Sequence, residues 1–336
     1  MNIASCPGCE PCAGLLTSNH RKDHITKNLI LEILSSAALR IVACALIGLA
    51  QVQAQVRGVY PLGMSATNSG VTPEPGFTYS NQLLIYSRNQ LKDPDGHVIA
   101  TGNNSVIMDM NTLTWVSKKE IPGGAKFSMS ATFPIANNSL ASDVAGQISG
   151  GGGFADSYYQ PFILGWDCNR VAIRTIYGFL APTGRFRSDA NDNVGSGYWT
   201  QTLASGQTFY LTENKATSVS AFQMYEFHST QDRTNIHPGQ NIDLDYSLTH
   251  SLTLRGKSRL QVGLVGYNQW QTTDKSGPGI TDQQAKAHYK VNAIGVGSNL
   301  MLPAQRVSIG FKYFKEFANR ATFQGYSIQF SGSIHF

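Results

Sequence analysis

The residues near the N-terminus include a set of thiols whose spacing could bind a metal. Cys6, Cys9 and Cys12 recur at every third position, and thiolates at such spacing can hold zinc or an iron–sulfur cluster. No fourth ligand follows at a regular spacing, and the three cysteines precede the export signal described below. We therefore expect a discarded leader here, with no metal and no cofactor in the exported protein.

Two further patterns could suggest catalysis. Gly150–Gly153 is rich in glycine, but no Gly-Lys-Ser/Thr follows it, so it lacks the pattern of a phosphate-binding loop. Some outer-membrane phospholipases use a Ser–His–Asn site, yet Asn241, His237 and His250 do not lie in a recognisable phospholipase motif. A triad is defined by geometry, which sequence does not give. We expect no enzyme, and keep a hydrolase as a less favoured alternative.

Charged residues at alternate positions are stronger functional candidates. They alternate with apolar residues, whose face of the strand would contact lipid. A Lys or Arg that faced lipid at mid-membrane would cost about 2–4 kcal/mol. We therefore predict that they line a lumen, where they would bias the passage of ions and solutes or form ion pairs that stabilise the wall. The candidate lumen-lining residues are Lys126, Arg174, Asp243, Asp245, Arg306 and Lys312.

The elements that would position these charges are β-strands. Period-two alternation recurs after residue 55, most clearly at the C-terminus, where Tyr326, Ile328 and Phe330 alternate with polar residues. The pattern predicts about twelve antiparallel strands, an even number that returns both ends of the chain to one side. They are expected near 76–88, 104–117, 122–134, 153–166, 170–182, 197–211, 216–228, 240–250, 258–271, 286–302, 305–317 and 322–336.

The connections between these strands alternate in length. Short connections are expected at 118–121, 167–169, 212–215, 251–257 and 302–304, and long ones at 89–103, 135–152, 183–196, 229–239 and 272–285. Tight periplasmic turns and long external loops are typical of outer-membrane barrels. We therefore predict an all-β fold, a transmembrane antiparallel β-barrel over residues 76–336.

Aromatic residues also fit a membrane barrel. Tyr158, Trp166 and Trp199 are candidates for the aromatic girdle at the lipid interface, with stacking on a solute in the lumen as the alternative. The chain ends on Phe336, and bacterial outer-membrane barrels typically end on an aromatic residue that the assembly machinery reads. We therefore expect Phe336 to serve as the barrel assembly signal.

The N-terminal region has the features of an export signal. Basic residues precede the apolar run 41–50, and Val52-Gln-Ala54 fits signal peptidase cleavage. We assign 1–54 to a leader with a cleavable signal peptide, of which 1–20 could be a mis-assigned start, and 55–75 to a periplasmic lead segment. A plug is the alternative for the irregular stretch that ends at Pro73 and Pro75, before the first strand. A lipoprotein box at Ile41-Val-Ala-Cys44 is the weaker reading. Only Cys168 would remain after cleavage, which excludes an intramolecular disulfide.

The composition agrees with this interpretation. Charged residues make up 14% of the 336 residues and aromatics 10%, with 33 glycines, which excludes a disordered chain. No apolar run after residue 55 is long enough for a transmembrane helix. The net charge of +5 is too small to suggest a nucleic-acid partner. A soluble β-sandwich remains a third alternative.

Several motifs resemble one family, in its order, over about residues 57–336. The motifs are Gly58-Val-Tyr60-Pro61-Leu-Gly63, Pro73-Glu-Pro75-Gly76-Phe77, Ala155-Asp156-Ser-Tyr158, Leu164-Gly165-Trp166, Phe179-Leu-Ala-Pro182-Thr183-Gly184, Asp243-Leu-Asp245-Tyr246 and Gly263-Leu-Val-Gly266-Tyr267. The chain thus resembles the outer-membrane β-barrels named for the meta pathway of phenol degradation. It departs from them at Arg185, where an acidic residue is common, so any charge-specific role of that loop is in doubt.

The resemblance implies a passive channel or transporter in the bacterial outer membrane. It would take up small hydrophobic or aromatic compounds, in connection with phenol degradation, and the family offers no catalytic residues to carry over. The expected partners are outer-membrane lipid, the barrel-assembly machinery and a small hydrophobic solute. A structural or adhesive barrel with binding loops is the alternative from a different class.

Overall fold

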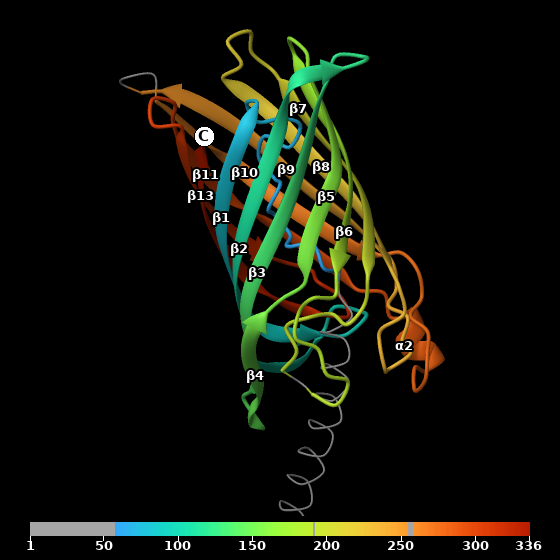
Figure 1. The fold of residues 1–336 in the computed structure, drawn as a ribbon. Coiled ribbons are helices and arrows are strands. Elements are labelled where there is room, and N and C mark those ends of the chain that lie inside the picture. The colour runs from blue at the N-terminus through green and yellow to red at the C-terminus, as the bar shows by residue number, and fades with distance from the viewer. Residues whose placement is uncertain (1–57, 191, 255–257) are drawn as a thin grey trace, which may run out of the picture. The chain divides into compact units, whose positions relative to one another are not determined.

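The computed structural model describes residues 58–190, 192–254 and 258–336, and these residues form a closed barrel (Figure 1). The expected leader 1–54, with Cys6, Cys9 and Cys12, lies outside them. The strands are β1 (Gly76–Lys92), β2 (Val98–Ile121), β3 (Ala125–Ser142), β4 (Gly146–Phe154), β5 (Ser157–Asp167), β6 (Val171–Ala181), β7 (Thr200–Tyr210), β8 (Thr217–His228), β9 (Asn241–Thr253), β10 (Arg259–Gln271), β11 (Lys290–Leu302), β12 (Val307–Glu316) and β13 (Phe323–His335).

The barrel closes because β1 pairs antiparallel with both β2 and β13. Strands β4 and β5 pair with successive parts of β3 and occupy one place in the wall. The thirteen-stranded sheet therefore has twelve places around the barrel. The prediction of an all-β antiparallel barrel of about twelve strands is confirmed.

The two ends of the barrel differ in their connections. Short turns such as 122–124, 168–170 and 303–306 lie at the end that also holds the C-terminus, here called the turn end. The opposite loop end carries 182–199, 229–240 and 272–289, the last of which includes the short helix α2 (Asp282–Lys286). No helix in the described ranges is long and apolar enough to cross a membrane.

Two of the long loops expected from sequence are largely strand. Most of 89–103 and 135–152 continues β1, β2, β3 and β4, joined by turns at 93–97 and 143–145 (Figure 1). These hairpins extend past the loop end, where neither face of the strands contacts lipid and neither face has to be apolar. Polar and Gly-rich sequence such as Ser149–Gly153 can therefore pair as strand without showing hydrophobic alternation.

The outer and inner faces of the wall follow the alternation. Outward side chains such as Leu203, Leu264 and Ile309 are more than half exposed. Many inward side chains of β7, β8 and β9 are polar and fully buried. They include Thr200, Thr202, Thr208, Ser220, Glu226, Asn241, Asp243 and Asp245. This arrangement reverses that of a soluble protein and suits an apolar surround with a polar interior.

What buries these inward groups is the segment before β1. Residues 58–72, here called the plug, run inside the barrel and appear in blue in Figure 1. Tyr60 packs against Phe222 of β8 in a tilted arrangement, with ring centroids 5.4 Å apart. The segment 55–75 was expected to be a periplasmic lead or a plug. The described residues 58–72 lie inside the barrel, where backbone N–H groups of Val59, Tyr60 and Gly63 donate to carboxylates on the wall.

Candidate functional site

The first anchor of the plug is Glu226 on β8. Its two carboxylate oxygens accept hydrogen bonds from the backbone N–H groups of Val59, at 2.8 Å, and Tyr60, at 2.7 Å. Glu226 is fully buried, and charge-assisted hydrogen bonds to backbone donors are about twice as strong as neutral ones. These hydrogen bonds thus give partners to backbone N–H groups of the plug, which belong to no helix or strand, and to a buried carboxylate.

Asp245 and Lys312 form the second anchor. Asp245 accepts hydrogen bonds from the Tyr60 hydroxyl at 2.6 Å, the Gly63 N–H at 2.9 Å and the Ser65 N–H at 3.0 Å. From β12, the Lys312 ammonium donates to the carbonyl oxygens of Gly63 and Met64, both at 2.8 Å. An anion and a cation on facing strands therefore hold the donors and acceptors of one backbone bend.

Further along, the plug lies close against the wall at Arg174 and at two wall glycines. Arg174 Nε donates to the Ser69 carbonyl at 2.9 Å. A Cβ on Gly206 would stand 2.0 Å from that carbonyl oxygen, and one on Gly165 would stand 1.8 Å from Thr72 Oγ1. Glycine at these two wall positions leaves the space that the plug occupies.

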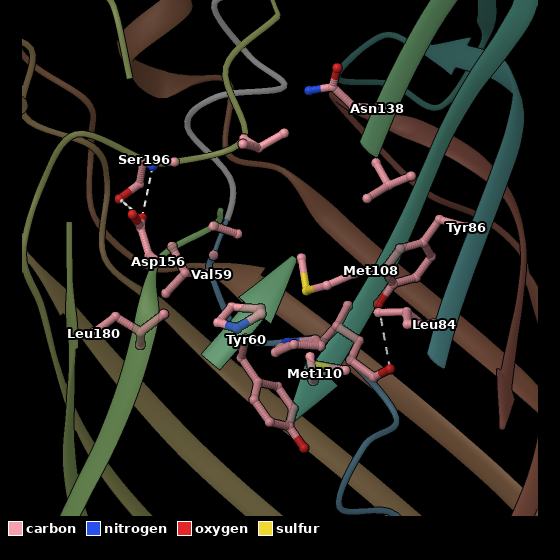
Figure 2. A pocket seen from close by; sticks show the side chains of 18 of the residues that line it. Val59, Tyr60, Leu84, Tyr86, Met108, Met110, Asn138, Asp156, Leu180 and Ser196 are labelled. Carbon is pink, nitrogen blue, oxygen red and sulfur yellow. Dashed lines mark hydrogen bonds between the residues drawn. The ribbon is translucent and has the colours of Figure 1, made fainter. Parts of the chain in front are cut away.

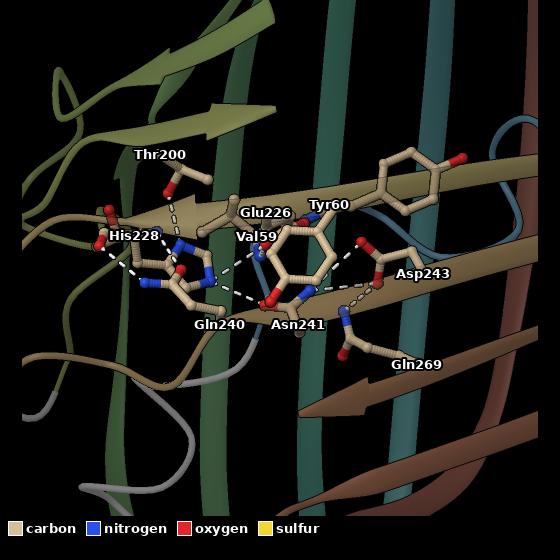
Figure 3. Close-up of polar contacts among 12 residues, drawn as sticks. Val59, Tyr60, Thr200, Glu226, His228, Gln240, Asn241, Asp243 and Gln269 are labelled. Carbon is tan, nitrogen blue, oxygen red and sulfur yellow. Dashed lines mark hydrogen bonds and ion pairs between the residues drawn. The ribbon is translucent and has the colours of Figure 1, made fainter. Parts of the chain in front are cut away.

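A polar network surrounds the Glu226 anchor (Figure 3). His228 lies between Thr200 Oγ1 and Asn241 Oδ1, each 2.8 Å from one of its ring nitrogens, and 3.4 Å from Glu226 Oε2. These residue types could form a nucleophile, a base and an orienting group. However, Thr200 and Asn241 are fully buried and neither they nor His228 line the cavity described next. The network therefore surrounds the carboxylate that holds the plug.

An apolar cavity of about 310 Å³ lies between the plug and the wall (Figure 2). Plug residues line one part of it, and most of the rest comes from β1, β2, β3 and the segment 193–198, with single residues from β4, β5, β6, β8, β10 and β13. Most of the lining side chains are apolar or aromatic, with four methionines among them. They include Tyr60, Leu62, Met64, Leu84, Tyr86, Met108, Met110, Pro134, Leu140, Tyr158, Leu180, Tyr198, Met224 and Phe323.

Charged side chains in the cavity lining are limited to Arg88 and Asp156. Asp156, between β4 and β5, accepts hydrogen bonds from the Gly184 N–H at 2.9 Å and the Ser196 N–H at 2.8 Å, and from the Ser196 hydroxyl. Arg88 of β1 pairs with Glu316 of β12 at 3.4 Å. Asp156 therefore holds the segment 193–198 against the wall.

The strongest metal-like cluster among the described residues lies away from this cavity, in the β1–β2 turn. Ligand atoms of Asp93, Asp95 and His97 lie within 4.8 Å of one another. Asp93 Oδ1 accepts from the N–H groups of Asp95, at 3.0 Å, and His97, at 2.8 Å. Desolvation raises the pKa of Asp93, but the hydrogen bonds from His97 outweigh it and lower the pKa from its ordinary value. The cluster is explained by the turn.

Most of the predicted lumen-lining charges lie inside. Asp243, Asp245, Arg174 and Lys312 touch the plug or its network, and Asp243 accepts from Gln269 Nε2 at 2.7 Å. Lys126 is half-buried near the turn end, on the face opposite the outward Phe127 and Met129. Arg306, expected on the inner face of a strand, lies exposed in the β11–β12 turn with φ of 54°. Strand β12 starts at Val307, two residues later than the expected start at 305.

The three girdle candidates occupy different places. Trp199 is half exposed at the loop end and packs on Phe179, with ring centroids 6.1 Å apart. Trp166 is near the turn end, where its Nε1 donates to the Gly123 carbonyl at 3.1 Å. Tyr158 points inward, lines the cavity and bonds Thr202 at 2.9 Å. Its position corresponds to the alternative of contact with a solute in the lumen.

Sequence reasoning did not select Arg88, Glu226 or His228. A signal for the last two exists, because they alternate with the aromatic Tyr225 and Phe227 of β8. Phe222 and Met224 obscure it, since they share the inward face and pack against the plug. For Arg88 there is no simple signal, because both faces of β1 carry large apolar residues.

Solved structures share this fold. The COG4313 outer membrane channel from Pseudomonas putida F1 matches with a TM-score of 0.65 and 13% identity, over 83% of this chain and 100% of that one. The β domain of the Bordetella autotransporter BrkA matches with a TM-score of 0.50 and 12% identity, over 78% and 100%. A search of curated proteins found no match. At these identities the structural likeness establishes the fold.

The sequence itself establishes the family. The family described as "Putative MetA-pathway of phenol degradation" matches residues 88–331, well over half of the chain. The matched region begins at Arg88, on β1, and runs through most of β13, so it includes Glu226, Asp245 and Lys312. The chain belongs to this family of phenol-degradation proteins, as the motifs had predicted.

Proposed function

We propose that this protein is an outer-membrane channel for the passive uptake of small hydrophobic or aromatic compounds, linked to the degradation of phenol-like molecules. The family and the fold support a membrane barrel with an apolar outer face. The observation that carries the solute class is the cavity, whose lining includes four methionines and four tyrosines. No covalent step is part of the proposal.

The size of the cavity fits this class. An apolar protein cavity of about 150 Å³ is enough to bind benzene, and this one measures about 310 Å³. A molecule of one or two rings would therefore fit. Methionine adapts its shape and makes favourable contacts with aromatic rings, so Met64, Met108, Met110 and Met224 suit a site that accepts several related solutes. Catabolism inside the cell would maintain the gradient for uptake.

Filling the cavity tests the proposal. Met110 is 4% exposed and lines the cavity, so Met110→Trp should occupy the space a solute needs. We expect the initial uptake of radiolabelled phenol or toluene, at low micromolar concentration, to fall about tenfold, since blocking a fitted site costs on the order of 1.4 kcal/mol or more. The assay uses a deletion strain that expresses each variant.

The matched control is Met129→Trp, which adds the same side chain to an outward position that is 42% exposed. It should leave uptake unchanged. Equal uptake by the deletion strain and the wild-type strain across a panel of aromatics would contradict the proposal. That result would favour the adhesive or structural reading of the barrel instead.

A further inference from the structure

Arg88 occupies an irregular point of the wall beside the cavity. The pairing of β1 shifts between Arg88 and Gln90 on both of its edges, toward β13 and toward β2. Such bulges redirect a side chain, and they are common next to functional sites. The Arg88 side chain is only 7% exposed and lines the apolar cavity. A cation is thus placed where most neighbours are apolar.

The guanidinium has unused donors. Among the described residues its one hydrogen bond is from Nε to Glu316 Oε1, at the long distance of 3.4 Å. A guanidinium offers five N–H donors; no described residue accepts a hydrogen bond from Nη1 or Nη2, and Arg88 lines the cavity. The group lies over the Tyr86 ring, 4.1 Å from its centroid, which fixes its plane.

Glu316 does not depend on Arg88 alone. Its carboxylate also accepts hydrogen bonds from the Tyr267 hydroxyl at 3.2 Å, Asn319 Nδ2 at 3.1 Å and the Gly325 N–H at 2.9 Å. The negative charge is therefore well solvated by protein donors. Arg88 can then offer its Nη edge to a second anion without leaving Glu316 unpaired.

The other charge in the cavity does not compete for this role. Asp156 has three donors of its own, and it lies across the cavity from Tyr86, on which Arg88 rests (Figure 2). The cavity is therefore polarised, with an available cation at one side and an apolar body of Met108, Met110 and Leu84 next to it.

From this placement we infer that the cavity selects small apolar carboxylates, with Arg88 as the residue that binds the carboxylate. The planar fork of a guanidinium matches a carboxylate in a bidentate way, and the apolar part of the solute would lie among the methionines. This inference rests on the proposed function and narrows its solute class to aromatic or short aliphatic acids.

A ligand series on the wild-type protein tests the inference without any mutation. Purified barrel in neutral detergent is dialysed to equilibrium against 2-naphthoate, against 2-naphthylmethanol, which has the same rings and no charge, and against 2-naphthylmethylammonium. We expect naphthoate to bind about tenfold more tightly than the alcohol, and the cation most weakly. Binding of the alcohol as tight as that of naphthoate would overturn the inference and leave the proposed function intact. Binding of none of the three would contradict both.

Variants then locate the effect. Arg88→Met should weaken naphthoate binding about tenfold with little change for the alcohol, and Arg88→Lys should keep part of the preference. Because Arg88→Met removes the ion-pair partner of Glu316, the double variant Arg88→Met with Glu316→Gln is the version without a buried unpaired charge. Arg259→Met, at an exposed position, controls for net charge. A loss in Arg259→Met equal to that in Arg88→Met would show a general charge effect and reject Arg88 as the anchor.

Discussion

Asp245 shows how much of the interior depends on single carboxylates. It receives two backbone N–H groups and a hydroxyl from the plug, and it is fully buried. An asparagine in its place would offer one oxygen and turn an NH₂ group toward those donors. Hydrogen bonds to a charged acceptor contribute about 1.5–3 kcal/mol each, so their loss would weaken the attachment of the plug.

We therefore predict that Asp245→Asn loosens the plug by about 3 kcal/mol. The expected result is a larger or more frequently open single-channel conductance in planar bilayers than for the wild-type protein. Asp232→Asn, on an exposed loop position, is the control and should conduct like the wild type. Identical conductance traces for all three proteins would show that Asp245 does not hold the plug.

The plug as an element depends on glycines in the wall. Gly206 of β7 allows the Ser69 carbonyl to approach where a Cβ would stand 2.0 Å from its oxygen. Because the obstacle is backbone on both sides, neither partner can move aside by changing a rotamer. Shape at this contact thus matters as much as hydrogen bonding at Asp245.

Gly206→Ala should displace the middle of the plug and make it accessible to protease from the turn end. We expect cleavage within residues 58–72 to accelerate at least about tenfold, since a clash of this kind costs on the order of 1–3 kcal/mol. Gly332→Ala on β13 is the matched control, because a Cβ there meets nothing within 4 Å. If both variants are cleaved at the wild-type rate, the contact at Ser69 is not a constraint on the plug.

The strands were predictable where lipid imposes alternation, whereas a plug was only one of two alternatives for the segment before β1, and its position could not be predicted. Residues 326–336 alternate as β13 does in the structure, because one face must be apolar. Residues 58–72 form few regular hydrogen bonds of their own and have no period, so their position follows only from distant partners such as Glu226. Phe222 and Met224 point inward against the rule for a wet lumen, because the plug covers them. The cavity combines residues from strands far apart in sequence.

At the scale of the whole molecule, the C-terminal residue lies at the seam that closes the barrel. Phe336 is 67% exposed, and its N–H donates to the Phe77 carbonyl of β1 at 2.8 Å. An exposed aromatic side chain at this place is available to a partner before the seam forms. We propose on this basis that Phe336 is the assembly signal.

We predict that Phe336→Ala lowers the amount of folded barrel in the outer membrane severalfold while the purified protein still refolds in detergent. The measurement is the band whose gel mobility shifts on boiling. Phe330→Ala, also on β13 and 47% exposed, is the control and should assemble normally. If the Phe336→Ala variant accumulates as folded barrel to wild-type amounts, Phe336 is not an assembly signal.

The way the plug enters the barrel has a consequence for the order of folding. Its anchors, Glu226, Asp245 and Lys312, come from β8, β9 and β12, so they are synthesised long after the plug itself. They face a common lumen only when β1 meets β13. Docking of the plug should therefore be a late kinetic step, separate from strand pairing. In refolding experiments, β-sheet circular dichroism should reach its final value before Tyr60 loses its exposure to solvent.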